Sequence, residues 1–183
     1  MATAEALYTA EEYGRRPDPG YPEELVRGRI VRMAQPNRRH GQVCGQAVYL
    51  LRRFFEDDDR GHVLSNDAGV ITERDPDTVR GADVAFYSYA RLPKGPLPSS
   101  IGPEVPELVF EVRSPSDRWR DILAKVTEYL DAGVLVVCVL DPGDESAYLY
   151  HADRNPQTLR SDEELVLPDL LGDFRLAVRR FFE

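Results

Sequence analysis

The strongest constraint on the fold of this chain is an acidic side chain in the middle of an apolar segment. Residues 108–112 read Leu-Val-Phe-Glu-Val, a run typical of a strand that is buried on both faces, and the acid within it is Glu111. An ionised carboxylate without a partner in such a place costs several kcal/mol, or its pKa shifts. Glu111 is therefore expected to have a partner.

A second acid, Asp83, lies in the same way within the apolar residues 79–87. Either acid alone could mark a strand end or pair with an arginine such as Arg80 or Arg113, because structural ion pairs also perturb pKa values. Two acids in core-like strands favour a different interpretation, in which Asp83 and Glu111 share a cation.

Lys125 is a third candidate. Residues 114–117 predict a helix start, and the periodicity that follows predicts a helix with Lys125 at the edge of its apolar stripe, free to point inward or outward. As an exposed residue it would pair with Asp121, four positions earlier, which contributes only a few tenths of a kcal/mol. Of the 23 lysines and arginines, however, only Lys94 and Lys125 are lysines, and a lysine suits the handling of water better than an arginine does. The stripe is expected to contain Trp119, Ile122, Leu123, Val126 and Leu130.

Length and composition fit a single domain over residues 1–183. No apolar run approaches the roughly 20 residues that cross a bilayer, and the first residues lack a basic region followed by an apolar one, so no membrane contact and a cytoplasmic location are expected. Cys44 and Cys138 are far apart in apolar segments, which predicts buried free thiols rather than a zinc site.

The net charge of −9 argues against tight non-specific binding of nucleic acid, which depends on clustered Lys and Arg. The charge is nevertheless uneven along the chain. Any affinity for DNA is expected to be weak and to come from the arginines of the first third, which are Arg15, Arg16, Arg27, Arg29, Arg32, Arg38, Arg39, Arg52, Arg53 and Arg60.

Local signals divide the chain into alternating helices and strands. Thr9 and Glu12 form a capping box that predicts a short helix, Gly28 predicts the turn of a hairpin over residues 24–33, and Asn37 predicts the cap of a helix over residues 38–56. Further strands are expected at residues 63–64, 70–72, 79–87, 108–112, 134–140 and 147–150, a long loop at 91–106, and a hairpin with a short terminal helix at the end.

Several motifs in this order resemble a bacterial family of restriction-endonuclease-like proteins with the PD-(D/E)XK nuclease fold. The resemblance covers nearly the whole chain from about Tyr21. The motifs are Glu24-Leu-Val-x-Gly, His40, Arg80-Gly-Ala-Asp83-Val-Ala-Phe, Leu108-Val-Phe-Glu111-Val-x-Ser-Pro-Ser, Lys125-x-x-x-Tyr129 and Ala132-Gly-Val with Asp141-Pro.

The resemblance implies an α/β fold, a restriction-endonuclease-like core in which a mixed β-sheet is flanked by α-helices. It implies that Asp83 and Glu111 are metal ligands, that Glu24 completes the site, and that Lys125 on the following helix is the catalytic lysine. Two positions depart from the superfamily pattern: Ala82 replaces the proline before Asp83, and Arg113 stands where Glu-x-Lys would place the lysine. Arginine stays protonated and cannot act as a base.

The implied chemistry is metal-dependent hydrolysis of a phosphodiester. Carboxylate ligands from Asp83 and Glu111, with a backbone carbonyl near Val112, suit Mg²⁺ or Mn²⁺, and Lys125 would orient the attacking water. His40 is either a surface histidine at a helix start or a contact to phosphate or substrate.

Two functions stay open on the sequence. The first is a metal-dependent DNA endonuclease, for which a homodimer would supply two sites to cut two strands. The second is a non-cleaving module that keeps the nuclease fold to bind nucleic acid or protein, which the acidic net charge and the altered motif flanks favour.

Overall fold

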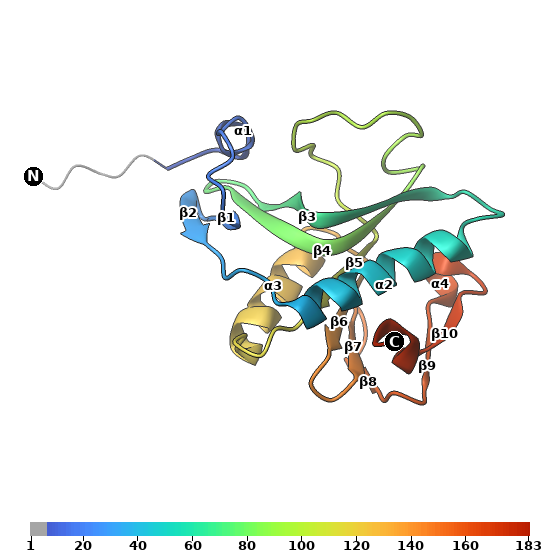
Figure 1. The fold of residues 1–183 in the computed structure, drawn as a ribbon. Coiled ribbons are helices and arrows are strands. Elements are labelled where there is room, and N and C mark those ends of the chain that lie inside the picture. Colours follow the sequence, from blue (N-terminus) through green and yellow to red (C-terminus); the bar gives the residue numbers. More distant parts are fainter. Residues whose placement is uncertain (1–6) are drawn as a thin grey trace, which may run out of the picture.

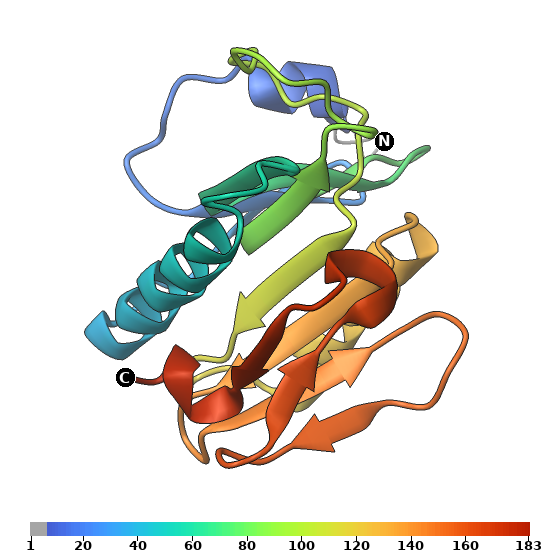
Figure 2. The same cartoon turned by 90° about the vertical axis from the view of Figure 1, so that its right-hand side faces the viewer.

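The computed structural model describes residues 7–183 as a mixed β-sheet with helices packed on it (Figures 1 and 2). The elements in chain order are α1 (Ala10–Gly14), β1 (Glu23–Val26), β2 (Arg29–Arg32), α2 (Arg38–Phe54), β3 (Gly61–Glu73), β4 (Thr78–Ser88), β5 (Leu108–Val112), α3 (Trp119–Asp131), β6 (Val136–Asp141), β7 (Ser146–Tyr150), β8 (Gln157–Leu159), β9 (Glu164–Val166), α4 (Pro168–Leu171), β10 (Arg175–Ala177) and the 3₁₀ helix η1 (Val178–Phe181).

The main sheet has the order β2-β1-β4-β5-β6-β7-β8, with β3 paired to β4. All its pairs are antiparallel except β5 with β6, which are parallel. Parallel neighbours need a crossover connection, and α3 supplies it. The predicted α/β class, a mixed sheet flanked by helices, is confirmed.

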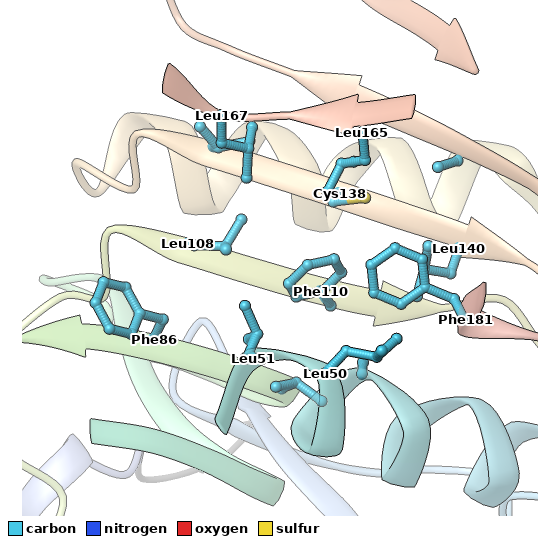
Figure 3. Close-up of a cluster of buried hydrophobic side chains, with 14 of the residues drawn as sticks. Leu50, Leu51, Phe86, Leu108, Phe110, Cys138, Leu140, Leu165, Leu167 and Phe181 are labelled. Carbon is cyan, nitrogen blue, oxygen red and sulfur yellow. The ribbon is translucent and has the colours of Figure 1, made fainter. Parts of the chain in front are cut away.

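The two long helices cover opposite faces of the sheet. Alternate residues of β4 and β5 point to opposite faces, so Val84 and Phe110 join the core beneath α2, while Ala85 and Val109 join the core beneath α3. The red C-terminal segment packs on the α2 side, where Phe181 meets the leucines of α2 around β5 (Figures 2 and 3).

One edge of β4 is shared by two short strands, and this opens the sheet. β3 pairs along almost the whole length of β4. On the other edge β1 pairs only at Val79, while β5 pairs only from Val84 to Phe86. Residues 80–83 of β4 therefore have no recorded strand pairing on that edge, and the side chain of Glu24 on β1 accepts the Gly81 N–H there.

A bulge in β3 faces the same part of β4. The register shifts between Ser65 and Ala68, and both Asn66 (φ 67°) and Asp67 (φ 55°) adopt the left-handed conformation that Asn and Asp tolerate. The bulge requires a glycine opposite it, because a Cβ on Gly81 would lie 2.8 Å from the Cβ of Asp67.

Several local predictions are confirmed, and some boundaries are wrong. The strands predicted at residues 63–64 and 70–72 are one strand, β3, and the strand predicted at residues 134–140 is β6, over Val136–Asp141. The side chain of Thr9 caps α1, that of Asn37 caps α2, and a turn with Arg27 and Gly28 at positive φ joins β1 to β2. The helix start predicted at residues 114–117 is instead a loop in which Asp117 accepts a hydrogen bond from the Ser114 backbone, and α3 begins only at Trp119. Among residues 7–183, no helix combines the length and apolar character needed to cross a membrane.

Candidate active site

Asp83 and Glu111 occupy opposite positions where the pairing of β4 with β5 ends. The last recorded pair is Val84 with Phe110, and the two acids are the next residues along their strands. Directly opposed residues of an antiparallel pair project to the same face, so the acids lie close together. The strands then separate, and the freed Val112 N–H donates to Asp83 Oδ2 over 2.6 Å. Both acids are buried, as the sequence predicts.

Glu111 is compensated only in part. The Tyr129 hydroxyl donates to Oε1 over 2.9 Å, and the Lys125 ammonium lies 3.7 Å from Oε2, beyond hydrogen-bond distance. Burial raises the pKa of Glu111 to about 8, and the charge of Asp83 adds to this rise against the opposing effect of Lys125. A cation beside the carboxylate would supply the missing compensation.

Lys125 points into the molecule because the buried face of α3 is rotated from the predicted stripe. Ile122, Val126 and Tyr129 are buried, whereas Leu123 is 41% exposed. Lys125 lies on this inner face and is largely buried. The apolar pattern alone misplaced the stripe because polar side chains of the site occupy part of the inner face.

The partner of Lys125 is Glu24, whose Oε1 accepts a 2.7 Å hydrogen bond from the lysine ammonium. The predicted alternative, a pair with Asp121, is wrong, since Asp121 pairs with Arg120. Burial opposes the charge on Lys125, but Glu111 and Glu24 outweigh it and raise the pKa of the ammonium. Lys125 is therefore protonated at any physiological pH.

Both oxygens of Glu24 are occupied by protein donors. Oε1 also accepts a 3.2 Å hydrogen bond from the backbone N–H of Gly81, and Oε2 accepts a 2.8 Å hydrogen bond from the guanidinium of Arg80. Burial opposes ionisation of Glu24, but Lys125 and Arg80 lower its pKa. Arg80 is held in turn by Glu128 through two hydrogen bonds of 2.6 and 2.8 Å. Glu24 thus joins the site as the anchor of Lys125.

His40 lies beside Asp83 in the first turns of α2. Its Nε2 is 3.2 Å from Asp83 Oδ2, and its Nδ1 is 3.4 Å from the Sγ of Cys44, one turn further along. Burial opposes protonation, but the hydrogen bond and charge of Asp83 raise the pKa of His40. The interpretation as a surface histidine is wrong, because the imidazole is mostly buried and contacts the acidic site.

These side chains surround one cavity of about 580 Å³. Its ionisable lining residues are Glu23, Glu24, His40, Asp67, Asp83, Glu111, Arg113, Asp117, Arg118, Asp121 and Lys125. The structure therefore brings together all five residues singled out from the sequence, and adds Asp67 from the β3 bulge. The Asn66-Asp67 pair between the strands predicted at residues 63–64 and 70–72 was the signal that could have revealed the bulge.

Arg113 occupies the position where the Glu-x-Lys pattern has a lysine, and it contacts Asp141 and Trp119. Its guanidinium lies 2.7 Å from the buried Asp141 and 5.2 Å from the ring centre of Trp119. Neither Arg113 nor Arg80 pairs with Asp83 or Glu111 among the described residues, so the arginine-pair interpretation of these acids is wrong. The sequence did not reveal the Arg80–Glu128 pair.

The donor set fits a hard divalent cation. In the part of the chain that the structure describes, Asp83 Oδ1 and Glu111 Oε2 accept no hydrogen bond, so each acid keeps one oxygen for a ligand. Carboxylate oxygens that face a water-accessible cavity are the ligands that Mg²⁺ and Mn²⁺ prefer. The raised pKa of Glu111 is consistent with this fit, because a cation would favour its ionised form.

Comparisons with known proteins identify a family and a fold. The model of the Uma2 family, described as "Putative restriction endonuclease", matches residues 10–179. A solved structure of a putative nuclease belonging to DUF820, from Anabaena variabilis, aligns with a TM-score of 0.80 over 96% of this chain and 97% of that chain. The two sequences are 15% identical, so this likeness concerns the fold. Comparison with functionally curated proteins finds no match.

Proposed function

The chain belongs to the Uma2 family, and we propose that it is a Mg²⁺- or Mn²⁺-dependent endonuclease that hydrolyses phosphodiester bonds of DNA. The observation that carries the proposal is the convergence of Asp83, Glu111 and Lys125 on one open cavity. Two acids for a cation and one ammonium for the reacting phosphate are the groups that this hydrolysis needs. The family membership confirms the resemblance seen in the sequence.

Asp83 and Glu111 would hold the metal in this proposal. Val112 fixes Asp83 through its N–H, and Tyr129 fixes Glu111 through its hydroxyl, so both carboxylates are oriented before a ligand arrives. A bound divalent ion supplies a more acidic water and offsets the charge that develops on the phosphate.

Lys125 acts as a hydrogen-bond donor in this proposal. Its ammonium faces the cavity beside Glu111, so it can orient a water or stabilise the phosphate oxygens. Glu24 holds the ammonium over 2.7 Å, and Arg80 holds Glu24. We assign Glu24 and Arg80 as positioning residues for Lys125, which refines the completing role that the resemblance implies for Glu24.

Metal dependence tests the proposal directly. Supercoiled, linear and single-stranded DNA should be cleaved with Mg²⁺ or Mn²⁺ and left intact when a chelator removes the metal. The metal should also raise the melting temperature by an amount that grows with its concentration, since it binds the native state. Asp83→Asn should lose both effects.

A matched control for this experiment is Asp169→Asn, which changes an exposed acid on α4 outside the cavity. It should cleave and respond to metal like the wild type. Wild-type protein that gains stability from Mg²⁺ but cleaves none of the substrates would contradict the enzyme and favour the non-cleaving module.

DNA affinity is expected to be weak and to fall steeply with salt. Arg38 and Arg118 are exposed, Arg118 lines the cavity, and Arg38 follows the cavity-lining segment of residues 33–37. Replacing either with alanine should weaken binding and reduce the slope of log K against log[salt] by about 1. Titrations at several salt concentrations measure this slope. Arg175→Ala, away from the cavity, should leave it unchanged; tight binding that ignores salt would point to another partner.

A further inference from the structure

Three different donor types meet at the start of α2. His40 and Cys44 are four residues apart and so project from the same face of the helix, toward Asp83 on β4. Nδ1 of His40 is 3.4 Å from the thiol of Cys44, and Nε2 is 3.2 Å from the carboxylate of Asp83. The sequence predicts Cys44 as a buried free thiol, but the thiol is only partly buried and contacts His40.

The spacing of the three donors is close to that of a metal site. One ligand atom from each of His40, Cys44 and Asp83 can be chosen so that all lie within 4.8 Å of one another. In a tetrahedral zinc site the bond lengths place such donors about 3.5 Å apart. Cys44 and Asp83 contact different nitrogens of the imidazole, so one ion can bind all three donors only after the ring or one of its neighbours rotates until a single nitrogen faces both.

We propose that Cys44, His40 and Asp83 form a binding site for Zn²⁺ and similar thiolate-binding transition metals. The cation is bound by the thiolate, one imidazole nitrogen and one carboxylate oxygen, and the thiol proton passes to solvent on binding. His40 and Asp83 line the cavity, so the fourth position takes a water from it. Three protein ligands with one open position are a common zinc arrangement.

This donor set differs in kind from that of Asp83 and Glu111. Thiolate and imidazole select softer metals, whereas two carboxylates select Mg²⁺ or Mn²⁺. Asp83 belongs to both donor sets, so the two ions compete for its carboxylate. The consequence, which rests on the proposed function, is that Zn²⁺ inhibits cleavage by displacing the hard metal. The zinc site itself does not depend on cleavage and is tested without it.

Co²⁺ is the probe, because its absorption reports both tetrahedral geometry and thiolate coordination. Titration of the full chain with Co²⁺ should give a thiolate-to-cobalt charge-transfer band that saturates at one equivalent and disappears when Zn²⁺ is added. Cys44→Ala should abolish the band, and His40→Ala should weaken the binding at least tenfold.

The second cysteine provides the matched control. Cys138 lies on β6 among apolar side chains (Figure 3), and it does not line the cavity. Cys138→Ala should keep the full band. A wild-type protein without the band at saturating Co²⁺, or a band lost in Cys138→Ala but kept in Cys44→Ala, would overturn the proposal.

A measurement on the unaltered protein guards against a variant that fails to fold. Zn²⁺ should slow alkylation of Cys44 by a small thiol reagent at least tenfold, as mapped by mass spectrometry of the cleaved peptides. Mg²⁺ should leave the rate unchanged, because it does not bind thiolates. Alkylation of Cys44 at the same rate with and without Zn²⁺ would overturn the site.

Discussion

Replacing Lys125 with methionine is expected to slow DNA cleavage by about 10²-fold or more, the usual scale for losing a positioned catalytic group. The ammonium stands between Glu24 and Glu111, where it can reach a water or phosphate in the cavity. Methionine fills the space but donates no hydrogen bond. Single-turnover rates at saturating metal would measure the loss apart from binding and product release.

The same substitution is expected to lower stability, because Lys125 is largely buried beside two acids. Removing the cation leaves Glu24 and Glu111 with fewer opposite charges, although Arg80 still compensates Glu24. Lys125→Arg should not restore the rate, since a planar guanidinium differs in shape from the ammonium that Glu24 holds over 2.7 Å. Melting temperatures of each variant show that the lost rate is not lost folding.

The chain contains its own control for this experiment. Lys94 is the other lysine, an exposed residue that pairs with Asp59. Lys94→Met removes the same charge and should cleave at the wild-type rate. A Lys125→Met variant that also keeps the wild-type rate would show that the metal site acts with some other group.

The sequence could reveal the parts of the site that depend on a few adjacent residues. Glu111 and Asp83 are conspicuous because a charged residue interrupts an apolar strand. Their shared face follows once the strands are antiparallel neighbours, which is the pairing that the structure has. The Asn37 cap and the turn at Gly28 are local as well, because each depends on a few adjacent residues.

The parts that it could not reveal depend on contacts between distant segments. Lys125 and Glu24 are 101 positions apart, and nothing within α3 indicates which way the lysine turns. The apolar pattern predicts that Leu123 is buried, but it is exposed. The pattern assumes that the inner face of a helix is apolar, whereas α3 packs over a polar cluster. The start of α3 was misplaced because Asp117 caps a loop backbone instead of the helix.

The sequence also could not indicate that Cys44 lies in a metal-binding cluster, and the reason is physical. Its spacing to His40 is a helix spacing of four, but a cysteine and a histidine on one helix are uninformative until a third donor is known. Asp83 comes from a strand that follows α2 and is placed opposite the β3 bulge. Only the fold supplies this third ligand.

The second large effect concerns stability: Arg80→Met is expected to lower the free energy of unfolding by about 3–5 kcal/mol, the range for breaking a buried ion pair by removing one partner. The guanidinium is only 11% exposed and binds two acids. Glu128 is 25% exposed and can turn to water, but Glu24 is 5% exposed and cannot. Most of the cost therefore comes from Oε2 of Glu24, which loses the guanidinium, while Lys125 still binds Oε1. Urea unfolding at constant pH measures it.

A double variant separates this explanation from a simple loss of packing. Glu24→Gln in the Arg80→Met background removes the carboxylate charge that Lys125 alone then compensates, so it should recover part of the lost stability, whereas Glu24→Gln alone should destabilise the protein. Arg175→Met, which breaks an exposed pair with Glu164, should cost under about 1 kcal/mol. If Arg80→Met costs no more than Arg175→Met, water reaches Glu24 and the carboxylate is not held by Arg80. Lys125 would then keep its position without this support, and Arg80 would have no part in positioning it.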